Sequence, residues 1–197
     1  FVAQDNYLFD CSLRENIRMG KPDATDDEVL AAARAACCDD FIGRLPHGYD
    51  TPAGEAGHAL SGGERQRISI ARAILKDAPI VVLDEATAFA DPENEVKIQA
   101  AFKRLARGRD GSPRTVLMVA HRLSTVRNAD KIVVLNEGCT AEQGTHEELL
   151  AAGGLYARMW ADYEKAVSWR ITSAEQSSKE PKGTEPHRAD RVEGSVA

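Results

Sequence analysis

Two adjacent carboxylates, Asp84 and Glu85, directly follow the apolar run of residues 80–83. A short apolar run of this kind indicates a buried strand, and open α/β sheets place their ligands at the carboxyl ends of such strands. At that edge Asp84 could hold Mg²⁺ through a water, and Glu85 could orient or deprotonate a water that attacks a phosphate. The same residues also suit a strand that ends in an ordinary polar turn, so this pattern alone leaves both interpretations open.

A second candidate site is the segment Leu-Ser-Gly-Gly-Glu-Arg-Gln-Arg at residues 60–67. Gly62 and Gly63 let a backbone approach a ligand closely, and the N–H groups at the start of the helix that follows attract an anion. Ser61, followed three residues later by Glu64, is equally the capping box of an ordinary helix. Taken alone, this segment also leaves a structural and a functional interpretation open.

Together and in this order, the two segments resemble the ABC ATPases. LSGGERQR matches the signature of that family, and IVVLDEAT, about twenty residues later, matches its Walker B segment. The resemblance covers roughly residues 1–165 and implies ATP and Mg²⁺ as ligands. It makes Glu85 catalytic and Asp84 a metal ligand, and it assigns ATP binding to Ser61, Gly62, Gly63 and Glu64. Glu64 stands where many members of the family have Gln, a variant that we expect to be tolerated.

Three further residues match elements of the family by position. Gln4 resembles the Q-loop glutamine, which in this family contacts Mg²⁺ or the attacking water and faces the membrane domain. Asp91 matches the D-loop aspartate, so the resemblance places it at the ATP site. His121 matches the catalytic switch histidine. It follows the apolar run of residues 115–119, which would end at the same sheet edge as Asp84, where an imidazole could hydrogen-bond a γ-phosphate.

Four stretches resemble exporter-type ABC proteins in particular, namely residues 6–17, 45–51, 121–126 and 142–150. In such proteins the membrane domain is usually fused upstream of the ATPase. Glu55, after Gly54, resembles the exporter loop that touches a coupling helix, although it also suits a solvated surface position. The D-loop reads Ala-Phe-Ala-Asp where Ser-Ala-Leu-Asp is more usual. A similar D-loop in some iron-siderophore transporters with an exporter-like fold suggests that class of cargo.

The sequence contains no Gly-x-x-Gly-x-Gly-Lys-Ser/Thr loop, the Walker A motif, which in this family lies upstream of the Q-loop glutamine. Its lysine and backbone N–H groups provide most of the binding to the β- and γ-phosphates. We therefore expect that the chain alone does not hydrolyse ATP. Because residue 1 is Phe and nothing near it resembles a signal peptide, we also expect an N-terminally incomplete ATPase domain.

The resemblance implies the ATP-hydrolysing part of an ABC transporter at the cytoplasmic face of the cell (inner) membrane. Its partners would be a second ABC ATPase domain, paired head to tail, and transmembrane domains that this chain does not contain. Residues 61–63 would serve the partner's nucleotide. Two other classes stay open. One is a soluble ABC ATPase of the DNA-repair or translation kind, and the other is a truncated, non-hydrolysing interaction protein.

The elements that must position these residues alternate between strands and helices, which favours an α/β fold. Apolar runs at residues 80–83, 115–119 and 132–135 predict strands buried on both faces of a largely parallel sheet. Capping boxes predict helix starts after Thr25, Ser61 and Thr145, and helical patterns occur near 93–107 and 122–128. Residues 136–138 predict the turn of a hairpin. The fold class expected is therefore a P-loop NTPase-like ABC ATPase domain with a helical signature subdomain.

Four segments follow from this organisation. Residues 1–4 would end the truncated core at the Q-loop, and residues 5–76 would form the helical signature subdomain. Residues 77–168 would form the RecA-like core with Walker B, D-loop and switch histidine. Residues 169–197 would be a disordered tail, because from about Thr172 the sequence contains almost no large apolar residue.

Composition excludes several other classes. A chain with 43% hydrophobic and 28% charged residues can bury a sizeable core, and its apolar runs are far shorter than the roughly 20 residues that cross a bilayer. A net charge of -6 argues against a nucleic-acid partner. The four cysteines include no CxxC pair, so neither a zinc site nor a disulfide framework is indicated, and a reducing compartment is the simpler interpretation.

Overall fold

The computed structural model describes residues 1–3, 6–84, 92–120 and 123–177. The chain divides into two compact units, Phe1–Val126 and Arg127–Ala197, which are described separately. Unit 1 contains, in order, α1 (Leu13–Arg18), α2 (Asp26–Ala35), α3 (Asp39–Ile42), η1 (Gly48–Asp50), η2 (Glu55–Gly57), α4 (Gly62–Lys76), β1 (Ile80–Asp84), α5 (Pro92–Leu105), β2 (Thr115–Val119) and α6 (Leu123–Val126). Unit 2 contains β3 (Ile132–Asn136), β4 (Cys139–Gly144), α7 (His146–Ala152) and α8 (Leu155–Ser177).

The helix starts predicted from capping boxes are confirmed at all three places. Thr25, Ser61 and Thr145 are the N-cap residues of α2, α4 and α7, and each shares a reciprocal pair of hydrogen bonds with a glutamate three residues later. These pairs satisfy backbone N–H groups that the first turn of a helix leaves without a partner. The start of α4, which carries the signature residues, is therefore determined by local sequence.

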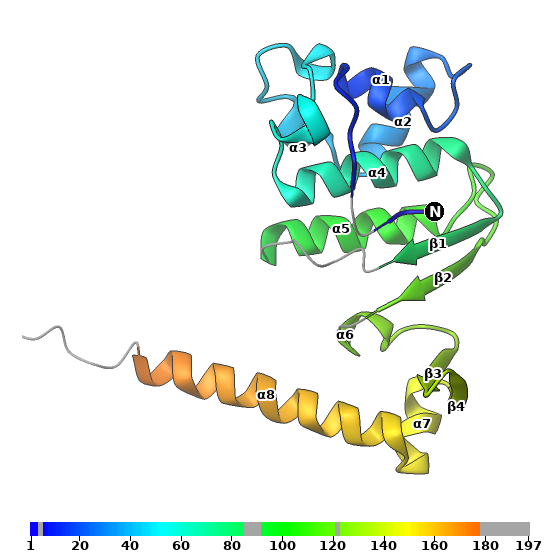
Figure 1. Cartoon of the computed structure of the whole chain (residues 1–197), viewed down its shortest axis with the longest axis vertical. Helices are drawn as coiled ribbons and strands as arrows, with labels where there is room; N and C mark the ends of the chain where they lie inside the picture. The colour runs from blue at the N-terminus through cyan, green and yellow to red at the C-terminus, as the bar shows by residue number, and fades with distance from the viewer. Residues whose placement is uncertain (4–5, 85–91, 121–122, 178–197) are drawn as a thin grey trace, which may run out of the picture. The chain divides into compact units, whose positions relative to one another are not determined.

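Helix α4 is the central element of unit 1. It packs against α1 and α2 on one side and against α5 on the other (Figure 1). Its buried side includes Ile68, Ile70 and Ala71, which belong to one continuous core with apolar residues from α1, α2, α5 and β1. A face of this width, apolar at helical spacing, is what docks a helix into a core.

Strands β1 and β2 are parallel, as predicted, with Asp84 opposite Val119 at their carboxyl ends. Val2 adds an isolated parallel bridge to the other edge of β1, opposite Leu83. The prediction that these strands are buried on both faces is wrong for the residues described. Val81 and Leu83 are buried, whereas Ile80 and Leu117 are 62% and 59% exposed.

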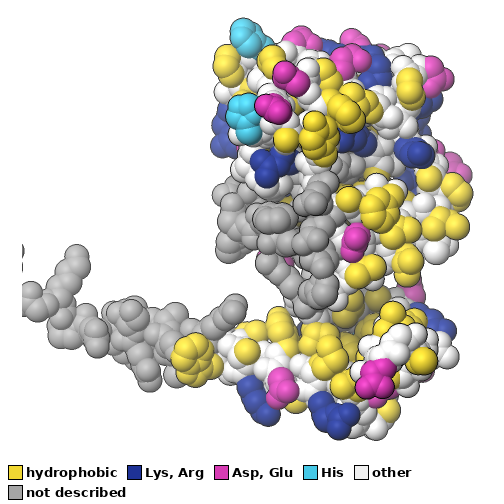
Figure 2. Space-filling model, in the orientation of Figure 1, with side chains coloured by type: hydrophobic (Ala, Val, Ile, Leu, Met, Phe, Trp, Pro, Cys, Tyr) yellow, Lys and Arg dark blue, Asp and Glu magenta, His cyan; other side chains and the backbone are white. Residues whose placement is uncertain are grey.

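The physical reason is that side chains alternate between the two faces of a sheet. One face joins the core of unit 1, and the other carries no described element of that unit. Hydrophobic side chains consequently gather on the surface over β1 and β2 (Figure 2). The apolar run identified the strands correctly, but it could not show which elements cover them.

In unit 2, β3 and β4 form the predicted antiparallel hairpin, and Glu137 and Gly138 occupy the turn with positive φ. The carboxylate of Glu142 accepts hydrogen bonds from the backbone N–H groups of Leu155 and Tyr156, the latter at 3.0 Å, so β4 caps the start of α8. At the same place His146 Nδ1 lies 2.8 Å from the Tyr156 hydroxyl. Glu142 therefore fixes the first turn of α8 to the hairpin, and His146 ties the same turn to α7.

Helix α8 continues to Ser177 and so includes residues 169–177, which the sequence pattern assigned to a disordered tail. Low apolar content does not end a helix that is already nucleated. Once the first turns are docked, each added residue gains a backbone hydrogen bond, and this stretch contains neither Pro nor Gly. Residues 178–197 lie outside the described part of the chain. The boundary predicted between residues 76 and 77 stays a prediction, because both sides fall in unit 1.

Within the described residues, none of the helices has the length and apolar content that crossing a bilayer requires.

Candidate nucleotide-binding site

Three chain segments lie together at the end of the small sheet in unit 1 where β1 and β2 finish. The Val2 N–H donates to Val82 O at 2.8 Å, and the Asp84 N–H donates to Val2 O at 2.9 Å, so the first residues lie beside the end of β1. Asp84 is paired in register with Val119, the last residue of β2. The segments that lead to Gln4, Glu85 and His121 therefore leave the sheet next to one another.

Asp84 is the one predicted metal ligand that the structure describes. It is half-buried at the carboxyl end of β1, where its carboxylate supplies the hard oxygen donor that Mg²⁺ prefers. Among the described residues no group of three or more His, Cys, Asp or Glu side chains could hold a metal ion. A single carboxylate fits a magnesium ion that keeps several waters and binds phosphate oxygens. Gln4, Glu85, Asp91 and His121 lie outside the described residues.

The signature residues form the first turn of α4. Ser61 is exposed, Gly62 is half-buried and Gly63 is buried. The Ser61 hydroxyl accepts a hydrogen bond from the Glu64 N–H at 3.3 Å, and the Glu64 carboxylate accepts one from the Ser61 N–H at 2.8 Å. A hydroxyl that accepts one hydrogen bond still has its own proton to donate, so Ser61 can donate to a phosphate oxygen while it caps the helix. The structural and functional interpretations of this segment are therefore compatible.

The ends of these elements lie on one side of unit 1. Figure 1 shows α4 and α5 beginning at the end of the unit at which β1 and β2 finish. This side therefore combines the positive end of the α4 dipole, which attracts anions, with the carboxylate of Asp84. The first turn of α4 suits a phosphate group, and Asp84 suits a cation that accompanies a polyphosphate.

The segment that resembles the exporter loop forms an exposed tight turn. Gly54 has φ +74, and the exposed Glu55 begins the short helix η2. The Glu55 carbonyl lies 2.9 Å from His58 Nδ1, and that imidazole ring lies where a side chain at Gly54 would stand. The exposure of Glu55 agrees with both a coupling contact and a solvated carboxylate.

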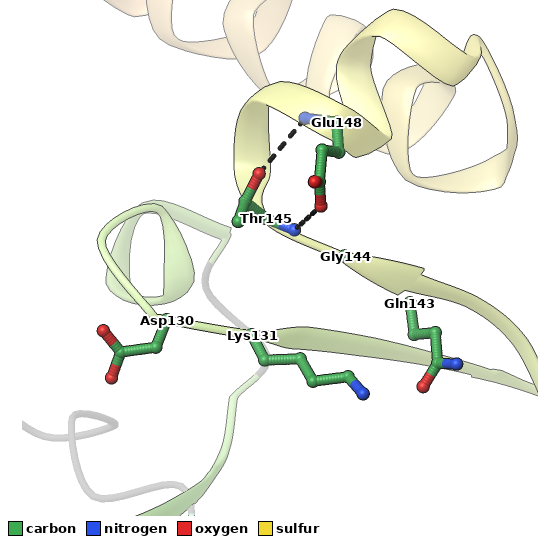
Figure 3. A pocket seen from close by; sticks show the side chains of 6 residues that line it. All are labelled: Asp130, Lys131, Gln143, Gly144, Thr145 and Glu148. Atoms are coloured by element: carbon green, nitrogen blue, oxygen red, sulfur yellow. Dashed lines mark hydrogen bonds between the residues drawn. The ribbon is translucent and has the colours of Figure 1, made fainter.

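A shallow depression of about 290 Å³ in unit 2 offers no comparable chemistry. Asp130, Lys131, Gln143, Gly144, Thr145 and Glu148 line it. Figure 3 shows the Glu148 carboxylate turned back towards the Thr145 N–H, from which it accepts a hydrogen bond at 2.8 Å. This capping box has the same form as the one at α4, but none of the candidate ATP-site residues lines the depression.

Sequence reasoning missed a buried cation directly behind the signature. Arg67, in the second turn of α4, is the largest of the fully buried side chains described. Its Nη1 lies 3.0 Å from the Asp40 carboxylate, which also accepts a hydrogen bond from Lys97 at 2.6 Å. The only sequence signal was a charged residue beside the apolar face of the helix, and the partners are 27 and 57 residues from Asp40 along the chain.

The fold and the site together define an α/β ATP-binding domain of the P-loop NTPase-like kind with a helical signature subdomain. More particularly, the chain belongs to the ABC transporter family, whose model, described as "ABC transporter", matches residues 1–88.

Relatives and a solved structure agree with this assignment. The chain is 56% identical over 160 residues to the mycobactin import ATP-binding/permease protein IrtA of Mycolicibacterium thermoresistibile. The aligned region covers 81% of this chain and 17% of that protein. It is 54% identical over 158 residues to an ATP-dependent lipid A-core flippase of Syntrophus aciditrophicus, and the aligned region covers 80% of this chain and 26% of the flippase. A bacterial Atm1-family ABC exporter with ATP bound matches with a TM-score of 0.75 and 47% identity, over 82% of this chain and 27% of the exporter. The chain thus spans about a quarter or less of the length of these proteins.

Proposed function

We propose that this chain is part of the ATP-hydrolysing domain of an ABC transporter and couples ATP hydrolysis to movement of a substrate across a membrane. The observation that carries the proposal is the gathering, at one end of unit 1, of the capped signature turn and the strand ends that lead to the candidate catalytic residues. The names of the relatives support it, since they are ATP-binding/permease proteins and an ATP-dependent flippase.

Each candidate residue has a distinct role in this proposal. Glu85 orients or deprotonates the attacking water, and His121 donates a hydrogen bond to the γ-phosphate. Asp84 and Gln4 would hold Mg²⁺, which when bound neutralises charge on the phosphate oxygens. Ser61, Gly62, Gly63 and Glu64 form the turn that meets a phosphate, and Asp91 lies at the contact between the two nucleotide sites.

Two such domains would pair head to tail, so that the signature of one faces the nucleotide held by the other. The glycine-rich phosphate loop of each domain would hold its own ATP beside Gln4, Asp84, Glu85 and His121. Closure on ATP and opening after hydrolysis would then move transmembrane domains between two states. This places the chain at the cytoplasmic face of the cell (inner) membrane, attached through those domains.

For the cargo we propose an iron-siderophore complex. The Ala-Phe-Ala-Asp D-loop at residues 88–91 supports this, as does the similarity to a protein named for mycobactin import. The rival is a lipid, because a lipid A-core flippase is almost equally similar. Proteoliposomes that accumulate a ferric siderophore on ATP addition would support the first cargo, and ATP-dependent movement of a labelled lipid between leaflets would replace it with the second.

The decisive experiment uses the longest natural reading frame that encodes this chain, purified in lipid. We expect ATP hydrolysis that Glu85→Gln lowers by about 10²- to 10⁴-fold while ATP binding remains. Glu147→Gln makes the same chemical change at an exposed position in the first turn of α7 and should leave hydrolysis unchanged.

The two rival classes predict different results. A protein that neither binds nor hydrolyses ATP would be the truncated interaction protein. Hydrolysis that is insensitive to lipid, with no membrane-spanning segment in the reading frame, would indicate a soluble ABC ATPase. Hydrolysis unaffected by Glu85→Gln would contradict the catalytic assignment itself.

A further inference from the structure

The strongest unexplained feature of unit 1 is the charge of Arg67, buried inside the helical part. Its side chain is only 2% exposed, and a guanidinium is never deprotonated in a protein, so the charge needs partners. Nη1 donates to the Cys37 carbonyl at 2.9 Å and to the Asp40 carboxylate at 3.0 Å, and the guanidinium carbon lies 4.8 Å from the centre of the Phe41 ring. All these partners come from α3 or the residues just before it.

Asp40 is shared between two helices. Its carboxylate accepts from Arg67 of α4 and, at 2.6 Å, from Lys97 of α5. Burial by itself raises the pKa of Asp40, but the hydrogen bond from Lys97 and the charge of Arg67 outweigh it, so the pKa lies below its ordinary value. The carboxylate therefore stays ionised and ties both helices to α3 at neutral pH.

The neighbouring carboxylate cannot take over this role. Asp39 accepts a hydrogen bond from the Tyr49 hydroxyl at 2.5 Å and pairs with Arg34 at 3.5 Å, both within the helical part of the unit. Among the described residues it forms no hydrogen bond or ion pair with α4 or α5. Asp39 is thus a matched control: the same residue type, one position away, engaged in hydrogen bonds but outside the link between the two helices.

The two residues that share Asp40 lie close to the parts of α4 and α5 that the proposed ATP site uses. Arg67 lies one turn after the signature residues, and Lys97 lies near the start of α5, which follows the D-loop residue Asp91. Both helices start at the same end of unit 1 (Figure 1). We propose that Asp40 is a positioning residue that holds the signature turn and the start of α5 in one fixed relation, so that both meet ATP together.

This inference rests on the proposed function for its effect on ATP but not for its structural basis. Lys97→Met removes the tie to α5 and leaves the Arg67–Asp40 pair intact, so the core of the helical part should still fold. Asp40→Asn weakens both ties, and Asp40→Glu restores a carboxylate. Asp39→Asn is the control for loss of a neighbouring charge.

The first measurement is ATP hydrolysis by the full protein in lipid. Lys97→Met and Asp40→Asn should each raise the KM for ATP by about threefold or more with little change in kcat, within the range that coupling residues produce. Asp40→Glu should recover part of the loss, and Asp39→Asn should match the wild type. Because the tie that Lys97→Met removes is one of the two that Asp40→Asn weakens, the double variant should behave like Asp40→Asn. Additive effects, or loss of folded protein with an unchanged KM, would overturn the proposal.

The second measurement is amide hydrogen exchange, which needs no hydrolysis. Asp40→Asn should speed exchange in both residues 62–66 and residues 92–96, Lys97→Met mainly in residues 92–96, and Asp39→Asn in neither. Unchanged exchange at both helix starts would refute the positioning role. A wild-type protein without ATP hydrolysis would instead refute the proposed function and leave this exchange result to decide the inference.

Discussion

The charge of Glu64 should affect the stability of the chain and its affinity for nucleotide in opposite directions. Its carboxylate accepts a hydrogen bond from the Ser61 N–H at 2.8 Å. It also lies at the positive end of the α4 dipole, the place proposed for a phosphate of ATP. Two anions at one helix start compete for the same N–H groups and the same dipole. Glu64→Gln keeps an oxygen that can accept the Ser61 hydrogen bond, and it removes the charge.

The magnitude follows from the value of an anion at an exposed helix start, about 0.3–1 kcal/mol. Glu64→Gln should therefore lower the free energy of unfolding by roughly that amount. The same interaction energy becomes available to the phosphate, which corresponds to an ATP affinity about two- to fivefold higher. Urea unfolding of the chain measures the first quantity, and the ATP concentration for half-maximal hydrolysis by the full protein measures the second.

The chain provides a closely matched control in α7. Glu148 and Thr145 form a capping box with the same two hydrogen-bond lengths, 2.8 Å and 3.3 Å. No nucleotide is proposed at this helix start. Glu148→Gln should lose similar stability and leave ATP affinity unchanged. The reasoning is refuted if Glu64→Gln weakens ATP binding, or if both variants change ATP affinity alike.

Three further predictions concern the chain itself. The pKa of Glu28 is lowered from 4.5 to about 2 by hydrogen bonds from Arg109 first and then from Lys21, so its stabilisation is full above pH 4.5 and is lost as the pH falls towards 2. The urea midpoint of Glu28→Gln should thus lie below the wild-type midpoint at pH 6, and the two should converge at low pH; a constant gap would contradict this. Gly20→Ala should cost about 1–3 kcal/mol in urea unfolding, because the new Cβ would lie 2.3 Å from a backbone carbonyl oxygen of α4, and an unchanged midpoint would show that the contact relaxes freely. A thiol reagent should label the exposed Cys139 first and Cys38 last, because burial raises the pKa of Cys38. Mass spectrometry of the peptides tests that order, and early labelling of Cys38 would speak against it.

Local features of the fold were predictable because their causes are local. A capping box needs only residues three apart, and all three predicted helix starts, after Thr25, Ser61 and Thr145, are confirmed. The hairpin turn at residues 136–138 was predictable for the same reason. The parallel pairing of β1 with β2 was predictable from the alternation of strands and helices along the chain. Burial was not, because Leu117 is exposed or covered according to which element lies over it, and its own sequence neighbours do not determine that.

Long-range contacts account for the rest of what the sequence did not show. The Asp40–Arg67 and Asp40–Lys97 pairs join residues that no sequence pattern connects, and they became visible only once α3, α4 and α5 were packed. Of the predicted site, the geometry of the signature turn and of Asp84 is described. The roles of Gln4, Glu85, Asp91 and His121 stay predictions that rest on the resemblance and on where their strands end.

The arrangement of α4 and β1 bears on how two nucleotide sites would communicate. In the proposed head-to-tail pair, the first turn of α4 serves one ATP and the end of β1 serves the other. Only a short turn separates Lys76 from Ile80, and Asp77 in that turn has φ +55 and pairs with Arg114. Because the turn is short and held by an ion pair to the residue before β2, it limits how far the end of α4 can move from the start of β1. A displacement of the signature at one site would then reach Asp84 at the other through this turn and along β1.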